Sequence, residues 1–317
     1  MRPTKIPLGI SSCLLGQKVR FDAGHKHNAY ITQTLGEFFS FEPFCPEVSI
    51  GLGTPREPIR LVSTGEDGSV RCVGTKDPAL DVTEDLTECG KAQAPWVKGV
   101  YGYIFKKDSP SCGMERVKVY NKSSARRDGR GVYAAQIIDT FPNLPVEEEG
   151  RLGDARLREN FVKRVFVYKR WRDLLDGKPK KKDFVDFHAQ HKLIYMSHNQ
   201  TKTRALGRIV AQIGEHDLPS FCDTYLAAVT ELMRKPATQR NHCNVLRHMQ
   251  GYLKRKLDAE DRAELDQMIE HYRLGYIPLI VPITILRHHF RKYPDPYILD
   301  SFYMNPHPRE LMLQNQL

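Results

Sequence analysis

Three cysteines of this 317-residue chain, Cys13, Cys45 and Cys112, each follow a short apolar segment. They lie 32 and 67 residues apart, so no local sequence motif joins them. Each apolar segment is predicted to be a buried strand, and open α/β sheets bind ligands in the crevice beyond the carboxyl ends of their strands. If the strands are parallel, the three thiols meet around one pocket at the edge of the sheet.

Three thiols without a fourth restrict the metal chemistry. A structural zinc site is closed by four ligands, usually with paired cysteines, and the chain contains no Cys-x-x-Cys. Thiolates hold iron–sulfur clusters, and three of them on a four-iron cluster would leave one iron open to a substrate. The alternative is three buried thiols of a protein core. Inert thiols are expected at the remaining cysteines, which are Cys72, Cys89, Cys222 and Cys243.

The elements that must position these cysteines alternate between strands and helices, which predicts an α/β fold with a mainly parallel sheet. Strands are expected over residues 5–12, 41–44 and 99–105, each leading to one cysteine. Residues 65–68 separate the β-like runs 60–63 and 70–73 and predict a hairpin. Helices are expected over residues 29–41, 79–92 and 132–141.

The periodicity breaks between Pro142 and Asp154, where prolines and an acidic run interrupt both patterns. We therefore expect two domains, residues 1–150 and residues 151–317, the second of them all α-helical. Asp154 and Asp183 are expected to cap helices in the second domain. Its further helices are expected over residues 184–197, 202–213, 219–234, 239–256, 259–273 and 281–293.

The charge is unevenly distributed between these halves. Residues 1–150 hold 19 basic and 19 acidic side chains, so residues 151–317 carry the whole net charge of +10. A neutral half joined to a basic half suggests one part for chemistry and one for holding a polyanion. The alternative is a basic solvated surface.

The composition describes an ordinary globular protein, with 40% hydrophobic and 27% charged residues. A mean hydropathy of −0.49, without an apolar run of about 18 residues, predicts no membrane span. The first six residues contain no long apolar segment, so the cytoplasm is the expected location. In that reducing compartment the seven cysteines are expected to be thiols or metal ligands, not disulfides.

The cysteine segments resemble the thiouracil desulfidase family. The similar segments are residues 11–16, residues 44–48 with 51–56, and residues 109–113. The second half is similar to a helical domain long classed as of unknown function, through residues 187–192, 206–207, 244–252 and 277–282. The two halves together resemble the bacterial tRNA 4-thiouridine desulfidases, and the resemblance covers nearly the whole chain.

The resemblance implies a [4Fe–4S] cluster on Cys13, Cys45 and Cys112, whose open iron would bind the thiocarbonyl sulfur of the substrate. Water would replace the sulfur at the ring carbon without net electron transfer, which makes the enzyme a hydrolytic desulfidase. The family's catalytic Glu and Ser correspond to Glu47 and Ser109. Glu47 would relay protons, and Ser109 would orient the water or the substrate carbonyl. Without the resemblance, they would be a surface carboxylate and a turn residue.

Basic side chains are candidates for contacts with the substrate and RNA. Residues 120–131 form a glycine-containing basic segment that is expected to be a loop opening a helix at Val132 and to hold phosphate. Arg56 is a comparable candidate, with an ion pair to Glu57 as the alternative. Basic residues near the start of the helical half would attract tRNA phosphates in a salt-dependent way. The candidate contacts are Arg56, Arg126, Arg127, Arg130, Lys180, Lys181 and Lys182.

Other residues of the helical half have simpler interpretations. His188, His191 and His198 could bind a metal, but helix packing or RNA contact is favoured. Tyr168 and Trp171 could stack on bases, but core packing is favoured.

Three functions remain open on the sequence. The leading hypothesis is removal of sulfur from 4-thiouridine in tRNA. The second is desulfuration of free thiouracil or thionucleosides. The third is a non-enzymatic RNA-binding iron–sulfur sensor, which should tolerate Glu47→Gln because it has no turnover to lose.

Overall fold

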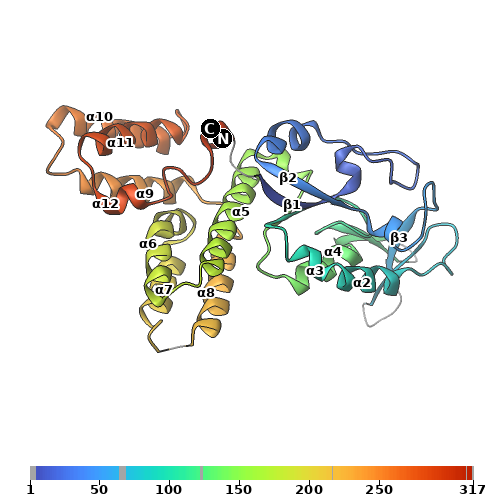
Figure 1. Ribbon diagram of the computed structural model, residues 1–317. Coiled ribbons are helices and arrows are strands. Elements are labelled where there is room, and N and C mark those ends of the chain that lie inside the picture. Colours follow the sequence, from blue (N-terminus) through green and yellow to red (C-terminus); the bar gives the residue numbers. More distant parts are fainter. Residues whose placement is uncertain (1–4, 64–68, 122–123, 216, 312, 316–317) are drawn as a thin grey trace. The chain divides into compact units, whose positions relative to one another are not determined.

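The protein is described by a computed structural model that covers residues 5–63, 69–121, 124–215, 217–311 and 313–315 (Figure 1). The chain divides into two compact units, Met1–Gly153 and Asp154–Leu317, called unit 1 and unit 2 below. Unit 1 is α/β and unit 2 is helical, so the predicted fold class is confirmed.

The first sheet of unit 1, sheet A, positions the cysteines. Its strands are β1 (Ile6–Ser11), β2 (Phe39–Phe44), β5 (Tyr103–Phe105) and β8 (Val146–Glu148). They run in the order β2-β1-β5-β8, and every neighbouring pair is parallel. The consecutive residues Leu8, Gly9 and Ile10 of β1 are all buried, as expected for a strand covered on both faces. Parallel pairing brings the carboxyl ends of β2, β1 and β5 to one edge.

Strand β8 lies in the acidic segment that the sequence analysis assigned to an irregular boundary, and that interpretation is wrong. Glu147 and Glu148 are buried in this edge strand. Their carboxylates are compensated, because Arg151 Nε lies 2.6 Å from Glu147 Oε1 and the Met114 backbone N–H donates to Glu148 Oε1 at 2.8 Å. Paired carboxylates can enter a strand that sequence polarity alone disfavours.

The second sheet of unit 1, sheet B, contains β3 (Ile59–Ser63), β4 (Val70–Gly74), β6 (Val117–Tyr120) and β7 (Ala125–Gly129) in the order β4-β3-β6-β7. The antiparallel pairing of β3 with β4 confirms the predicted hairpin, whose turn at residues 65–68 lies outside the described residues. Strand β7 corrects the expectation of a phosphate-holding loop over residues 120–131, because residues 125–129 pair with β6.

The helices of unit 1 are short. They are α1 (Pro46–Ser49), α2 (Thr83–Ala92), α3 (Ala94–Val97) and α4 (Val132–Thr140), with α2 beside α4 in Figure 1. The helix expected over residues 29–41 is confirmed only in part, because its turns are not α-helical and its last residues form a strand. That segment forms a π-helical turn at Tyr30–Thr34 and a 3₁₀ turn at Leu35–Glu37 before β2 begins at Phe39. Pairing with β1 takes the residues after Phe39 into the sheet.

Unit 2 is built from helices around one aromatic and aliphatic core. Trp171 is 2% exposed and stacks on Tyr225 at 5.4 Å between ring centroids, which favours its core role over base stacking. Asp154 caps the first helix by accepting from the backbone N–H groups of Arg156 and Leu157. The helices are α5 (Ala155–Asp176), α6 (Lys181–His198), α7 (Gln200–Ala211), α8 (Leu218–Met233), α9 (Gln239–Tyr252), α10 (Ala259–Arg273), α11 (Ile280–Lys292) and α12 (Pro296–Asp300).

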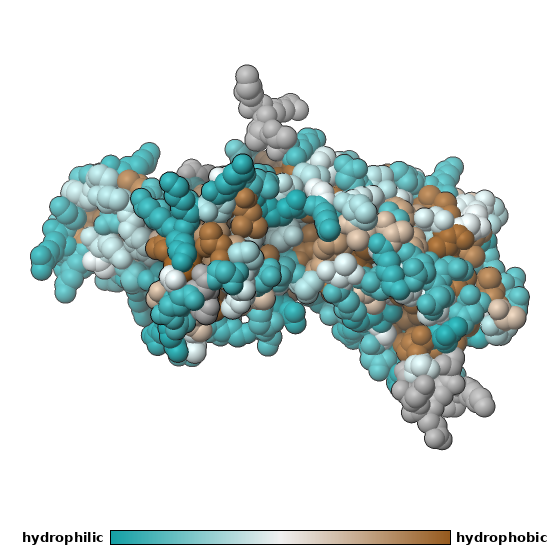
Figure 2. Space-filling model, turned by 60° about the horizontal axis from the view of Figure 1, so that its bottom comes forward, coloured by the Kyte–Doolittle hydropathy of each residue, from teal (hydrophilic) through white to brown (hydrophobic). Residues whose placement is uncertain are grey.

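Helix α6 begins three residues earlier than expected. Lys180 is its N-cap, so Asp183 lies in the first turn, where its carboxylate accepts from the Lys180 backbone N–H at 2.7 Å. Among the described residues, no helix combines the length and apolarity needed to cross a membrane. Hydrophilic side chains also cover most of the face drawn in Figure 2.

Candidate active site

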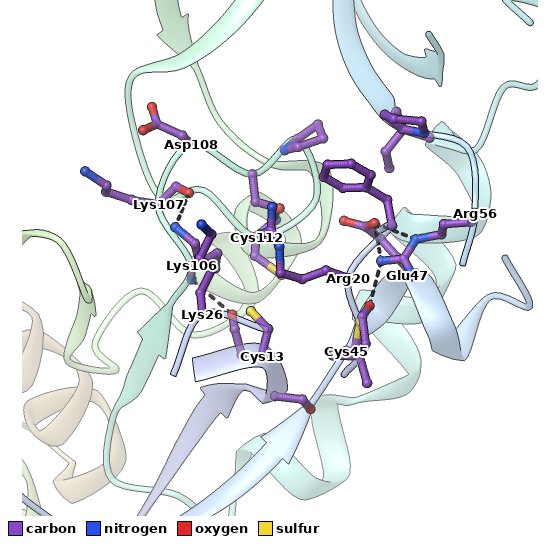
Figure 3. Close-up of a pocket in the computed structure, with 18 of the residues that line it drawn as sticks. Cys13, Arg20, Lys26, Cys45, Glu47, Arg56, Lys106, Lys107, Asp108 and Cys112 are labelled. Atoms are coloured by element: carbon purple, nitrogen blue, oxygen red, sulfur yellow. Dashed lines mark hydrogen bonds and ion pairs between the residues drawn. The ribbon is translucent and has the colours of Figure 1, made fainter. Parts of the chain in front are cut away.

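Cys13, Cys45 and Cys112 line one cavity of about 320 Å³ in unit 1 (Figure 3). Cys13 lies in a 3₁₀ turn directly after β1, Cys45 follows β2, and Cys112 lies in the loop after β5. The three thiols therefore lie together at the edge of the parallel sheet, as the sequence predicts. Ligand pockets of small molecules commonly begin at about 300 Å³.

Each of the three thiols is mostly enclosed by protein. Burial raises the pKa of Cys13 to about 11, although the positive charges of Lys106 and Arg20 lower it in part. Burial also raises the pKa of Cys45 and of Cys112. A buried thiol becomes a thiolate readily only when a positive group or a hydrogen-bond donor compensates its charge.

Hydrogen-bond donors surround the sulfur atoms of Cys45 and Cys112. Backbone N–H groups of Val48 and Glu47 act against the rise in the pKa of Cys45. The Ser11 hydroxyl likewise acts against the rise in the pKa of Cys112. These donors favour the thiolate form, which is the form that binds metal.

The loop that carries Cys112 is held against the start of α4 by a glycine. A Cβ atom added to Gly131 would lie 2.6–2.7 Å from backbone atoms of Ser111, Cys112 and Gly113. The Gly131 backbone N–H also donates to the Gly113 carbonyl at 2.7 Å. Any side chain at position 131 would therefore displace the cysteine loop.

Glu47 lies in the first turn of α1, two residues after Cys45, and its carboxylate lines the cavity. Arg56 donates to Glu47 Oε2 from Nε at 2.9 Å and from Nη2 at 2.7 Å. The other guanidinium donors reach the carbonyl oxygens of Val19 at 2.9 Å and Gly53 at 2.8 Å. Arg56 is therefore committed to Glu47 and to two loops, whereas the sequence suggested a substrate contact or a pair with Glu57.

Ser109 and Glu47 are connected through a residue that the sequence analysis did not single out. Ser111 Oγ donates to Glu47 Oε1 at 2.5 Å, and Ser109 Oγ lies 3.0 Å from Ser111 Oγ. A hydroxyl has one proton to donate, so Ser109 is the donor to Ser111 when Ser111 donates to Glu47. Ser109 lines the cavity and Ser111, 1% exposed, lies behind it. The Ser-x-Ser-Cys spacing was the available sequence signal.

The cavity wall opposite Glu47 is basic. Figure 3 shows Lys106 and Lys107 on the side of Cys13, across from the Glu47–Arg56 pair. Lys106 Nζ lies 2.6 Å from Glu149 Oε1. Arg20 and Lys26 also line the cavity, which therefore favours an anionic group or a ligand with acceptor atoms.

The arginines expected to hold phosphate lie on or next to strand β7. Their side chains are exposed, and each has an acidic partner. Arg126 pairs with Asp128 at 3.3 Å, Arg127 with Asp108 at 3.2 Å, and Arg130 with Asp139 at 2.9 Å. None of the three lines the cysteine cavity as the described residues define it.

In unit 2, Lys180, Lys181 and Lys182 are exposed at the start of α6. The three candidate histidines are buried and bonded within the unit. His188 Nδ1 meets the Tyr225 hydroxyl at 3.0 Å, His191 Nδ1 the Phe187 carbonyl at 2.7 Å, and His198 Nδ1 the Lys235 carbonyl at 2.8 Å. These contacts support helix packing and not a metal site.

Two family matches divide the chain. Residues 8–149 match the 2-thiouracil desulfurase family, and residues 192–308 match DUF1722, a protein family of unknown function. The uncharacterized protein YbgA of Escherichia coli (strain K12) is 34% identical over 132 residues, which cover 41% of this chain and 78% of YbgA. The uncharacterized protein YbbK of Bacillus subtilis (strain 168) is 33% identical over 132 residues, 40% of this chain and 85% of YbbK.

A solved structure described as the [4Fe–4S]-dependent thiouracil desulfidase TudS is 28% identical, with a TM-score of 0.36. The similarity covers 47% of this chain and 94% of that one. Through residues 8–149, which match the 2-thiouracil desulfurase family, the chain is a thiouracil desulfidase-like protein.

Proposed function

We propose that the protein is an iron–sulfur-dependent desulfidase that removes sulfur from 4-thiouridine in tRNA and leaves uridine. The observation that carries this proposal is the convergence of Cys13, Cys45 and Cys112 on a cavity that Glu47 also lines. The family match of residues 8–149 supports the same chemistry.

The donor set fits a [4Fe–4S] cluster better than a single metal ion. Among the described residues, no three His, Cys, Asp or Glu side chains are gathered closely enough to hold one ion. Thiolates that bind different irons of a cluster are spaced more widely than the ligands of one ion, and thiolates are the ligands that such clusters use. Cys13, Cys45 and Cys112 would hold the cluster, and the Ser11 hydroxyl would donate to the Cys112 sulfur.

When bound, the cluster supplies a Lewis-acidic iron for the thiocarbonyl sulfur of the substrate. The overall reaction converts the thiocarbonyl and water into a carbonyl and hydrogen sulfide, so no electrons are transferred. Glu47, held by Arg56, accepts a proton from the attacking water and returns it to the leaving sulfur or the ring nitrogen. Ser109 orients the water or the substrate at the cavity wall, and Ser111 connects it with Glu47.

The tRNA substrate is proposed from the charge of the second half. Residues 151–317 carry the whole net charge of +10. Lys180, Lys181 and Lys182 are exposed together at the start of α6. Cationic side chains of this kind supply salt-dependent affinity for RNA.

Free thiouracil or a thionucleoside is the second candidate substrate. The matched family is described by 2-thiouracil, and the cavity lies within unit 1. In this case unit 2 would serve stability or assembly. The two candidates predict a different order of kcat/KM among substrates. Only an enzyme that acts on tRNA gains binding energy from contacts outside the base.

The test uses the full chain, reconstituted with iron and sulfide without oxygen. Thiolated tRNA, 4-thiouridine and 2-thiouracil are supplied separately, and loss of the thiocarbonyl absorbance is measured together with released sulfide. We expect the highest kcat/KM on tRNA. Faster turnover of the free base would favour the second candidate, and unchanged absorbance of all three with a full cluster would overturn the desulfidase proposal.

Glu47→Gln separates the enzyme from an RNA-binding sensor. The amide cannot accept the proton, so we expect turnover to fall about 10²–10⁴-fold while the cluster is retained. A sensor would show no turnover in the unchanged protein and the same RNA affinity in the variant.

A further inference from the structure

A second cavity, of about 440 Å³, adjoins the cysteine cavity in unit 1. The two share Ile59, Asp108 and Pro110 as lining residues, so they are neighbours. The second cavity lies over β3 and β6 of sheet B and is named the sheet B cleft. Figure 3 shows Asp108 at the rim of the cysteine cavity, away from the Glu47–Arg56 pair.

The sheet B cleft is basic. Arg60, Lys118 and Arg127 line it, and Asp108 is the one acidic side chain that lines it among the described residues. Asp108 pairs with Arg127 at 3.2 Å, and both side chains are more than half exposed. Arg60 and Lys118 therefore remain as the positive charges without an acidic partner in the described part of the cleft.

Arg60 lines the cleft, and two features describe its guanidinium. Its Nε is buried and has no hydrogen-bond partner in the described residues, which leaves a guanidinium donor unsatisfied. Its guanidinium carbon also lies 5.6 Å from the centroid of the Tyr120 ring, which lines the same cleft. A guanidinium beside an aromatic ring combines a partner for phosphate with a surface for stacking a base.

We propose that the sheet B cleft binds the phosphate next to the thiolated nucleoside, while the base occupies the cysteine cavity. The inference rests on the proposed function and adds to it the residues that bind the phosphate of the substrate. Arg60 and Lys118 bind the phosphate oxygens, and Tyr120 supports the sugar or a flanking base. The phosphate belongs either to a mononucleotide or to a phosphodiester of RNA.

Binding tests this inference independently of turnover. Uridine, uridine 5′-monophosphate and the trinucleotide UpUpU are titrated into the reconstituted full chain by calorimetry. We expect the monophosphate to bind about tenfold more tightly than uridine, as one charge-assisted contact predicts. A further gain with the trinucleotide would identify RNA as the source of the phosphate.

Lys118→Ala removes one exposed cation of the cleft. The monophosphate should lose about threefold or more of its affinity advantage over uridine, because one charged contact is lost. Lys98→Ala removes an exposed lysine of the same unit that lines neither cavity, and it should leave that advantage unchanged. Arg60→Gln should act in the same direction as Lys118→Ala.

Equal affinity of the unchanged protein for uridine and the monophosphate would overturn the inference. So would a preference for the monophosphate that both Lys118→Ala and Arg60→Gln leave intact. Desulfidation is measured in parallel, so an inactive protein that still prefers the monophosphate would overturn the proposed function and support the cleft.

Discussion

Arg56 and Glu47 form a forked ion pair at the wall of the cysteine cavity. Two nitrogens of the guanidinium lie 2.9 and 2.7 Å from the same carboxylate oxygen, Oε2. The two side chains are 5% and 14% exposed. Glu47 Oε1 remains for Ser111, so both oxygens are fixed by protein donors. The pair sets the direction of the Glu47 carboxylate.

Arg56→Lys keeps the charge and loses the fork. An ammonium cannot donate to Glu47, Val19 and Gly53 in the geometry of a guanidinium. We expect kcat on thiolated uracil to fall about tenfold or more, with KM changed less, because Glu47 is less well positioned. The measurement compares kcat and KM at equal iron content. A kcat equal to that of the unchanged protein would show that the fork does not position Glu47.

Arg56→Gln leaves the Glu47 carboxylate without its positive partner. Removing one partner of a buried ion pair typically costs about 3–5 kcal/mol. The free energy of unfolding of unit 1 should therefore fall by several kcal/mol in urea denaturation followed by circular dichroism. Arg71→Gln, which breaks a more exposed pair with Asp81, is the control and should cost about 1 kcal/mol or less. Equal costs would contradict the assigned burial.

Ser111→Ala interrupts the connection between Ser109 and Glu47. A hydrogen bond to a charged group contributes about 1.5–3 kcal/mol, so kcat should fall about 10- to 100-fold. Glu47→Gln combined with Ser111→Ala should then lose little more than Glu47→Gln alone, since both act through one carboxylate. Full additivity of the two losses would show that Ser111 acts elsewhere.

The convergence of the three cysteines could be predicted because parallel strands place their carboxyl ends at one edge. The position of Glu47 near Cys45 could also be predicted, because Glu47 lies only two residues after Cys45, in the first turn of α1. The partner of Arg56 could not be predicted, since Glu57 is adjacent in sequence while Glu47 is adjacent only in the fold. The role of Ser111 depends on a hydroxyl direction that spacing does not specify.

Strands β7 and β8 show the limits of local pattern. Residues 125–129 carry charged side chains and became a strand because β6 supplies backbone partners. Glu147 and Glu148 entered β8 because Arg151 and the Met114 backbone compensate them. In both cases the deciding partner is a backbone group or a charged side chain, which hydrophobic periodicity does not register.

The buried histidines of unit 2 predict acid sensitivity. Burial lowers the pKa of His188 to about 4 and the pKa values of His191 and His198 to about 3. In the unfolded chain the pKa is about 6.5, so below that pH the unfolded state binds more protons. The free energy of unfolding is therefore highest above pH 6.5 and falls towards pH 4, by about 1.4 kcal/mol per pH unit for each histidine.

Trp171 reports this transition in a Trp96→Phe background, because the chain has two tryptophans and only Trp171 lies in unit 2. Urea midpoints should fall steadily from pH 7 to pH 5. His191→Leu should flatten the dependence, whereas His25→Leu, at an exposed position of unit 1, should not. A midpoint that is constant over this range would contradict the neutral state of the buried histidines.

Gly131→Ala should loosen the Cys112 loop, because its Cβ would overlap the backbone of Ser111 and Cys112. We expect lower iron content after reconstitution and faster loss of iron to a chelator. Gly251→Ala is the matched control, since its Cβ would meet no atom within 4 Å. Equal iron retention by the two variants would show that the loop tolerates the displacement.

The iron content of cysteine variants tests the central claim most directly. The full chain and the variants Cys13→Ser, Cys45→Ser, Cys112→Ser and Cys222→Ser are reconstituted without oxygen, and iron and acid-labile sulfide are measured per chain. We predict about four irons and four sulfides in the unchanged chain and in Cys222→Ser, with most of both lost in the other three. Full iron and sulfide in any of those three variants would contradict a cluster held by these cysteines.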